Sequence, residues 1–213
     1  MRCIKLWAKK RGIYSNVLGY LGGVSWALLV ARVCIDNPGL PVYKLLTQFF
    51  KFYSEYQWGP QNPLAICPIL NDSNLVTFDM GSNLFKELSF KDMMPIMTPS
   101  FPSVNSSFNI SDSTKEVFLT EFEKGQKITQ AICKGEPVSW SRLFKQFPFF
   151  KAYSHFIMVT LASKTVEDHD RWFGFAETKV KKIVKLIETL DIKILQGLLE
   201  CRPHATTFNI ESE

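Results

Sequence analysis

The chain has 213 residues, which is long enough for one large domain or two small ones around a dry core. A composition of 46% hydrophobic and 21% charged residues excludes an intrinsically disordered protein. An excess of 25 basic over 20 acidic residues favours phosphate-bearing ligands without identifying one. The five cysteines form no CxxC pair, so the sequence indicates neither a disulfide framework nor a zinc site and favours a reducing compartment.

Helical spacing dominates the first third of the chain. Residues 2–13 alternate apolar and charged positions and predict an amphipathic helix that ends at Gly12. A second helix, apolar nearly all round and therefore central, is predicted from a cap at Ser15 or Asn16 to about residue 34. Spacing of leucine and phenylalanine then predicts a third helix from Val42 to Glu55.

A basic start followed by the apolar run 17–31 also has the outline of a secretory signal, and N-x-S sequons occur later in the chain. The run is shorter than the roughly 20 residues that span a bilayer. Arg32 follows it without a small-x-small cleavage site. A secreted or membrane-anchored protein is therefore the least favoured interpretation of the chain, and we expect no membrane partner.

The middle of the chain is irregular. Residues 57–113 are rich in Pro, Asn and Ser, and so long a loop in a compact domain usually wraps a core or builds a binding surface. The helical pattern returns from Ser113 to Ile132 and ends near Gly135-Glu136-Pro137. We place a domain boundary there, between residues 1–136 and residues 137–213.

The last part alternates element types. His155 to Ser163 is predicted as a buried strand, Thr165 to Leu190 as a long helix, and residues 192–201 as either strand or helix. Strand, crossover helix and strand indicate the first half of a small α/β sandwich. The predicted fold class is therefore α+β, with a mainly helical domain followed by a partial sandwich.

Catalytic patterns are largely missing from the sequence, which has no Walker loop, GxSxG or HExxH. The two carboxylates of Asp168-His169-Asp170 would diverge by about 200° on a helix, so they are typical of a solvated helix start and not of a metal site. We predict no catalytic and no metal-ligating residue in this chain.

An anion site is indicated near the start. Backbone N–H groups at a helix start with cations nearby suit a phosphate, although an exposed basic face would have the same spacing. The side chains concerned are Lys5, Lys9, Lys10, Arg11, Tyr14 and Asn16. Gly22 and Gly23, if inside a helix, each cost about 1 kcal/mol relative to alanine, so either a neighbouring helix or a flat ligand must approach their backbone.

Three groups of motifs follow one another along nearly the whole chain. They are IKLWAK, GIYSN and GYLGGVSWA at residues 4–27, MPIMTPSFP and NSSFNIS at residues 94–111, and the weaker FFKAYSHF and RWFG at residues 149–174. Together they closely resemble the central domain and the start of the RNA-binding domain of eukaryotic nuclear poly(A) polymerases. The match fades in residues 57–92.

The resemblance implies roles for particular residues. Lys5 and Tyr14 would contact the ATP phosphates, and Asn16 would meet the ribose or the adenine. The base would lie on Gly22, Gly23 and Val24, with Thr98 approaching it from another side. A basic face of the predicted long helix would hold the RNA backbone, the alternative being a solvated face; its residues are Lys179, Lys181, Lys182 and Lys185.

The resemblance also implies a template-independent polynucleotide adenylyltransferase that adds AMP from ATP to the 3′ end of pre-mRNA in the nucleus, beside the cleavage and polyadenylation machinery. In the family a separate N-terminal domain holds Mg²⁺ or Mn²⁺ with acidic residues. We expect that domain to be absent here, residues 137–213 to be an incomplete RRM-like (ferredoxin-like) domain, and this chain alone not to polymerise. The alternative is a catalytically inactive RNA- or protein-binding module.

Overall fold

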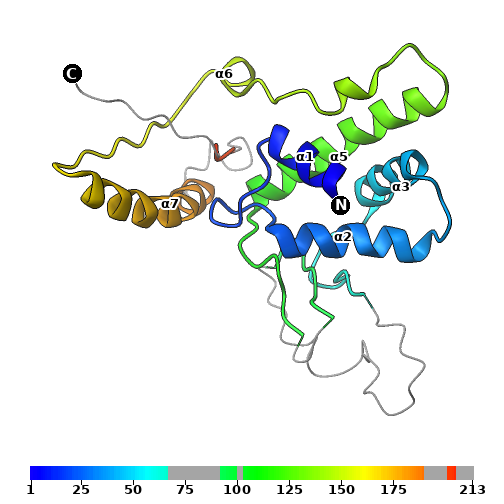
Figure 1. Cartoon of the computed structure of the whole chain (residues 1–213). Coiled ribbons are helices and arrows are strands. Elements are labelled where there is room, and N and C mark those ends of the chain that lie inside the picture. Colours follow the sequence, from blue (N-terminus) through cyan, green and yellow to red (C-terminus); the bar gives the residue numbers. More distant parts are fainter. Residues whose placement is uncertain (67–91, 100–102, 190–200, 205–213) are drawn as a thin grey trace.

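The computed structural model describes residues 1–66, 92–99, 103–189 and 201–204. A helical body is formed by α1 (Arg2–Lys10), α2 (Gly23–Asp36), α3 (Val42–Glu55) and α5 (Asp112–Cys133). Beyond it follow the 3₁₀ turn η1 (Trp140–Arg142), the short helix α6 (Phe149–Ala152) and the long helix α7 (Val166–Glu188), which projects from the body (Figure 1).

Aromatic side chains make the core of the helical body. Trp7 of α1 stacks on Phe122 of α5 at a centroid distance of 5.9 Å and meets Phe50 of α3 edge-on at 4.8 Å. Trp26 of α2 packs edge-on against Trp7 at 5.9 Å. Each such pair contributes about 0.5–1.5 kcal/mol beyond the area it buries, so one continuous cluster joins all four helices.

Close packing of α3 on α5 depends on one residue. A Cβ atom added at Gly125 of α5 would lie only 2.3 Å from Cδ1 of Phe50, which is far inside van der Waals contact. The missing side chain therefore lets the phenyl ring lie directly on the backbone of α5.

Three helix predictions in this body are confirmed. The predicted helix at residues 2–13 is α1, which ends before Gly12 at a left-handed φ of 70°. The helix predicted from Val42 to Glu55 is α3 with the same bounds. The one predicted from Ser113 to Ile132 is α5, and it begins with a capping box in which Ser111 and Thr114 bond each other's backbone N–H groups.

The prediction for the second helix is wrong at its start. Neither Ser15 nor Asn16 is its cap, because turns follow Ser15, whose carbonyl accepts the N–H groups of both Leu18 and Tyr20. The helix α2 begins only at Gly23, with Gly22 as its N-cap. Gly22 and Gly23 are therefore at a helix start and not inside a helix, so the cost assigned to them above does not apply.

The described parts of residues 57–113 are irregular, as predicted. Isolated bridges join Leu64 to Ile96 and Met97 to Asn105, and no element longer than a bridge forms among the described residues there before α5 begins at Asp112. The segment is anchored to α2 by the hydroxyl of Ser25, which is 3.1 Å from the carbonyl of Ser106.

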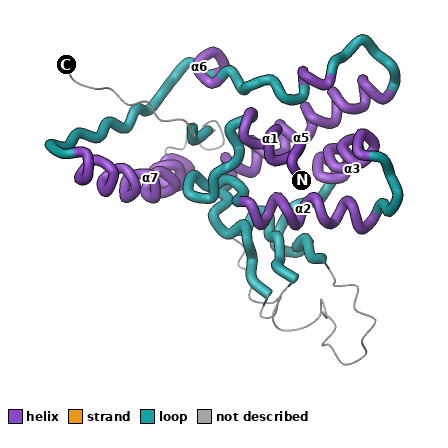
Figure 2. Tube along the Cα trace, in the orientation of Figure 1, coloured by secondary structure: helices purple, strands orange, loops and turns teal. Residues whose placement is uncertain are grey.

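The buried strand predicted at His155–Ser163 is wrong. These residues are extended but pair with no neighbour, and most of their side chains are exposed, with Met158 83% accessible (Figure 2). A strand needs a hydrogen-bonding neighbour, and none of the described residues supplies one. The described part of the chain is thus mostly helical and the α/β sandwich does not appear in it; residues 192–200 lie outside the described ranges.

The long helix predicted at residues 165–190 is confirmed as α7. Its last turn meets the helical body, because Oε1 of Glu188 accepts hydrogen bonds from the hydroxyl of Ser111 at 2.7 Å and from the N–H of Ser113 at 2.9 Å. A carboxylate at the positive end of α5 is favourable. This contact fixes the basic part of α7 beside the first turn of α5.

Candidate nucleotide-binding site

The exposed face of α1 brings two ammonium groups over one aromatic ring. Lys5 and Lys9 are one turn apart, so their side chains leave the helix on the same side. Their Nζ atoms lie 5.6 and 5.5 Å from the ring centroid of Tyr14. The ring attracts both cations, but the two like charges repel each other, so an anion placed between them would be stabilised.

The first turn of α2 lies beside this pair. A Cβ atom added at Gly23 would be 3.1 Å from the hydroxyl of Tyr14, and one at Gly22 would be 3.4 Å from Cβ of Asn16. The two glycines therefore let Tyr14 and Asn16 approach the helix backbone. Gly23 is exposed, as is Val24, which is 62% accessible.

Backbone donors are available at the same place. The first N–H groups of a helix have no partner within the helix, and the helix dipole makes this end positive. At α2 the N-cap is Gly22, which has no side chain to accept from them. N–H groups, a phenol and two ammonium groups thus converge on one exposed surface, an arrangement that suits a phosphate chain.

A chain of polar contacts orients Asn16. The ammonium of Lys181 is 3.0 Å from Oδ1 of Asn109 and can only donate, so it fixes the carboxamide of Asn109 with its oxygen towards α7. The amide nitrogen of Asn109 then donates to both the backbone and the side-chain oxygen of Asn16, at 3.2 Å each. The amide nitrogen of Asn16 has no acceptor among the described residues and remains a donor for a ligand.

Thr98 lies apart from these groups. Its hydroxyl accepts the N–H of Val104 at 3.0 Å, and its own N–H donates to the carbonyl of Val104 at 3.0 Å, which closes a tight loop. None of the hydrogen bonds of Thr98 within the described residues goes to Tyr14 or Asn16. Thr98 is therefore on a neighbouring segment. The other residues predicted to bind ATP lie together at α1 and the start of α2: Lys5, Tyr14, Asn16, Gly22, Gly23 and Val24.

The four lysines predicted for RNA differ in their surroundings. Lys182 and Lys185 are exposed, Lys179 lies over the ring of Phe175 with its Nζ 4.7 Å from the centroid, and Lys181 binds Asn109. Sequence reasoning missed Asn109 as a site residue, because it is 93 positions from Asn16 and only the fold brings the two amides together.

Two other kinds of site have no support in the described residues. The described residues contain no group of three or more His, Cys, Asp and Glu side chains that could hold a metal ion. Within the same ranges, no helix combines the length and the apolar character needed to cross a bilayer.

Two family profiles together match most of the chain. The family profile described as "Poly(A) polymerase central domain" matches residues 1–146, and "Poly(A) polymerase predicted RNA binding domain" matches residues 148–200. The chain is 38% identical over 208 residues to nuclear poly(A) polymerase 4 of Arabidopsis thaliana, covering 98% of this chain and 27% of that protein. It is 40% identical over 190 residues to the poly(A) polymerase of Dictyostelium discoideum, covering 89% of this chain and 22% of that protein.

The chain thus spans about a quarter of the length of these curated relatives. One profile alone covers more than half of the chain, and the matches include all the residues gathered at α1 and α2. The chain belongs to the poly(A) polymerase family.

Proposed function

We propose that this chain is the ATP- and RNA-contacting part of a nuclear polynucleotide adenylyltransferase, which adds AMP from ATP to the 3′ end of pre-mRNA without a template. The observation that carries the proposal is the convergence of Lys5, Lys9 and Tyr14 on the start of α2. The curated relatives named above are poly(A) polymerases, and the Arabidopsis one is nuclear by name, which supports both the reaction and the compartment.

Each group at this surface has a distinct task. The ammonium of Lys5 and the phenol of Tyr14 bind triphosphate oxygens, and the N–H groups at the start of α2 add further donors. The base lies against Gly22, Gly23 and Val24 at the start of α2, next to Tyr14 and Asn16, which occupy the space left by the missing Cβ atoms of the two glycines. The amide nitrogen of Asn16 donates to the adenine or the ribose, and Thr98 borders the base from the neighbouring segment.

A divalent ion, Mg²⁺ or Mn²⁺, would neutralise charge on the transferring phosphate. The described residues offer no set of carboxylates for it. In this proposal the metal-holding acids come from another part of the protein, and this chain binds and orients ATP and the RNA end. The cleavage and polyadenylation machinery is the expected protein partner.

Removing the charge of Lys5 is expected to weaken ATP binding. A hydrogen bond to a charged group contributes about 1.5–3 kcal/mol, so Lys5→Ala should raise the dissociation constant roughly ten- to a hundredfold. Tyr14→Phe, which keeps the ring under Lys5 and Lys9 but removes the hydroxyl, should have a smaller effect in the same direction. Calorimetric titration of the purified chain with ATP measures both.

The matched control is Lys44→Ala, because Lys44 is an exposed lysine on α3, outside this surface. It should bind ATP like the parent chain. Equal ATP affinity for Lys5→Ala and Lys44→Ala would remove the basis of the proposal.

The lysines of α7 are expected to bind the RNA backbone. Each phosphate contact on single-stranded nucleic acid contributes about 0.7 to the slope of log K against log salt. The four lysines are Lys179, Lys181, Lys182 and Lys185. Replacing all of them by alanine should weaken the binding of oligo(A) and make the slope of log K against log salt less steep. Fluorescence anisotropy at several salt concentrations measures it, with Lys44 and Lys51 replaced together as the control; an unchanged slope would reject the role.

A further inference from the structure

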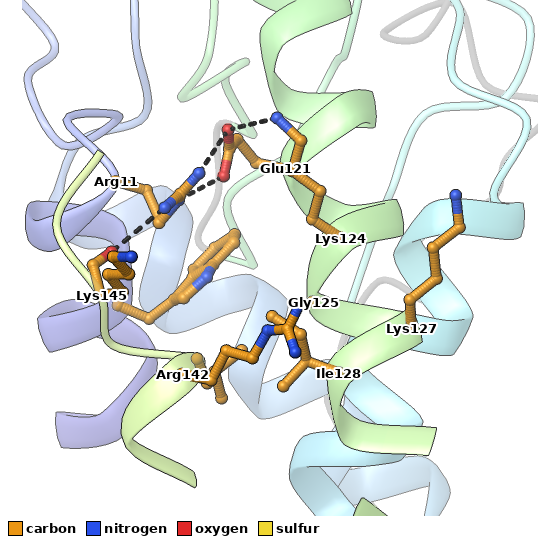
Figure 3. Close-up of a pocket in the computed structure, with 10 residues that line it drawn as sticks. Arg11, Glu121, Lys124, Gly125, Lys127, Ile128, Arg142 and Lys145 are labelled. Atoms are coloured by element: carbon orange, nitrogen blue, oxygen red, sulfur yellow. Dashed lines mark hydrogen bonds and ion pairs between the residues drawn. The ribbon is translucent and has the colours of Figure 1, made fainter. Parts of the chain in front are cut away.

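A second basic surface lies on the other side of α1. A hollow of about 390 Å³ opens between the end of α1, the middle of α5 and the segment that follows η1 (Figure 3). Side chains from all three contribute to it, including Trp7, Arg11, Lys124, Ile128, Arg142 and Lys145. Its volume is in the range of pockets that hold a ligand or a single anchoring side chain.

The charge around this hollow is strongly unbalanced. Five basic residues and one acidic residue line the hollow. The acidic residue is Glu121, whose side chain is fully buried and already forms ion pairs with Arg11 and Lys124. Lys127, Arg142 and Lys145 form no ion pair with any carboxylate of the described residues. Their charges are therefore available to a negatively charged partner.

The floor of the hollow is apolar. Trp7 is 1% accessible and Leu143 2%, and Ile128 is partly buried beside them. Such a recess accepts the end of an aliphatic or aromatic side chain. It offers no exposed aromatic face on which a nucleobase could stack, and the nearby ring of Phe147 is covered by the guanidinium of Arg202 at 3.5 Å.

The position of this hollow separates it from the ATP surface. Trp7 lies two residues after Lys5, which is a rotation of about 200° on a helix. The faces of α1 that carry Lys5 and Lys9 on one side and Trp7 and Arg11 on the other therefore point in different directions. An occupant of the hollow does not compete with ATP.

We propose that this hollow is a docking site for an acidic peptide segment of a partner protein. One apolar side chain of the peptide enters the recess above Trp7 and Ile128. Glu and Asp residues on both sides of it pair with the basic rim. Charge complementarity and the apolar floor together select this class of ligand over RNA, whose phosphates would find the cations but whose bases would find no stacking partner.

A short fluorescein-labelled peptide of Glu and Asp with one central Phe is the probe, and its binding to the whole chain is followed by anisotropy. The test variant reverses three exposed charges at the rim together: Lys127→Glu, Arg142→Glu and Lys145→Glu. The control variant reverses three exposed lysines elsewhere: Lys44→Glu, Lys51→Glu and Lys151→Glu. Thermal unfolding of both variants shows whether they keep the parent stability.

The rim variant should bind the peptide at least about tenfold more weakly than the control variant, since like charges then face each other. Replacing the central Phe of the peptide by Ser should also weaken binding about tenfold, because the recess loses its apolar occupant. ATP should not displace the peptide, and loss of ATP binding in Lys5→Ala should leave peptide binding unchanged.

Three results would overturn the proposal. One is no binding of the peptide to the parent chain, and another is equal binding by the rim and control variants. The third is displacement of the peptide by unlabelled oligo(A) together with loss of oligo(A) binding in the rim variant, which would make the hollow an RNA site.

Discussion

Replacing Glu121 by alanine is expected to lower the free energy of unfolding by about 3–5 kcal/mol, because removing one member of a buried ionic cluster leaves the others uncompensated. The carboxylate is fully buried on α5 and accepts from Nε and Nη2 of Arg11 (Figure 3). Arg202 approaches it at 3.4 Å and Lys124 at 3.3 Å. Three cations from three parts of the chain thus depend on one carboxylate.

Urea unfolding of the parent chain and the variant measures the difference. Glu123→Ala is the matched control, since Glu123 is an exposed carboxylate on the same helix and its loss should change stability by less than about 0.5 kcal/mol. Similar unfolding midpoints for Glu121→Ala and Glu123→Ala would show that the ionic cluster contributes little to stability.

The same cluster predicts a dependence on pH. Burial alone raises the pKa of Glu121, but the hydrogen bond from Arg11 and the charges of Arg11, Lys124 and Arg202 outweigh it, so the pKa is lowered from its ordinary value of 4.5. A folded-state pKa below the unfolded one gives stability that is complete above pH 4.5 and is lost as pH falls through the lower folded value. Glu121→Gln should remove this part of the acid sensitivity.

Gly125→Ala is expected to destabilise the chain by about 1–3 kcal/mol or more. The added Cβ would lie 2.3 to 2.8 Å from three atoms of the Phe50 ring, so α3 must move away from α5 or the ring must leave its place. The ring is fully buried and contacts Trp7 and Phe49, which leaves it little room to turn. Thermal or urea unfolding measures the loss.

A second glycine provides the control. Gly174 is in α7, and a Cβ atom added there would meet nothing within 4 Å. Gly174→Ala should therefore be neutral or stabilising by up to about 1 kcal/mol, as expected from helix propensity alone. If both substitutions had the same effect, the contact between α3 and α5 would not be as tight as the structure indicates.

Local pattern was sufficient for most helices and insufficient for the site. The spacing of leucine and phenylalanine defined α3, and Ser111 followed by Thr114 supports the start of α5 through short-range hydrogen bonds. The same reasoning placed the start of α2 too early, because apolar residues 17–21 continue its pattern although they form turns buried against the core. A periodic pattern of apolar residues indicates which side chains are buried, and a buried turn can have the same pattern as a helix.

The candidate site depended on the resemblance as well as on residue types. Charge and spacing indicated an anion site near Lys5 and Tyr14 but did not exclude an exposed basic face, and motif similarity selected the nucleotide. Neither residue type nor motif similarity could reveal the role of Asn109 or the ion pairs of Glu121 with Arg11 and Arg202, since these contacts join residues about 80 to 110 positions apart. The strand predicted at residues 155–163 failed because β structure requires a partner that sequence pattern alone does not supply.

The polypeptide returns to its beginning near residue 202. The hydroxyl of the buried Tyr20 donates a hydrogen bond to the carbonyl of Pro203 at 3.0 Å. Burial raises the pKa of Tyr20, so the hydroxyl keeps its proton. Arg202 also bonds the carbonyl of Arg11 at 2.7 Å. Cutting the backbone between the two family-profile regions should therefore leave fragments that remain associated, and the two regions should lose their amide protection in a single event during native-state exchange.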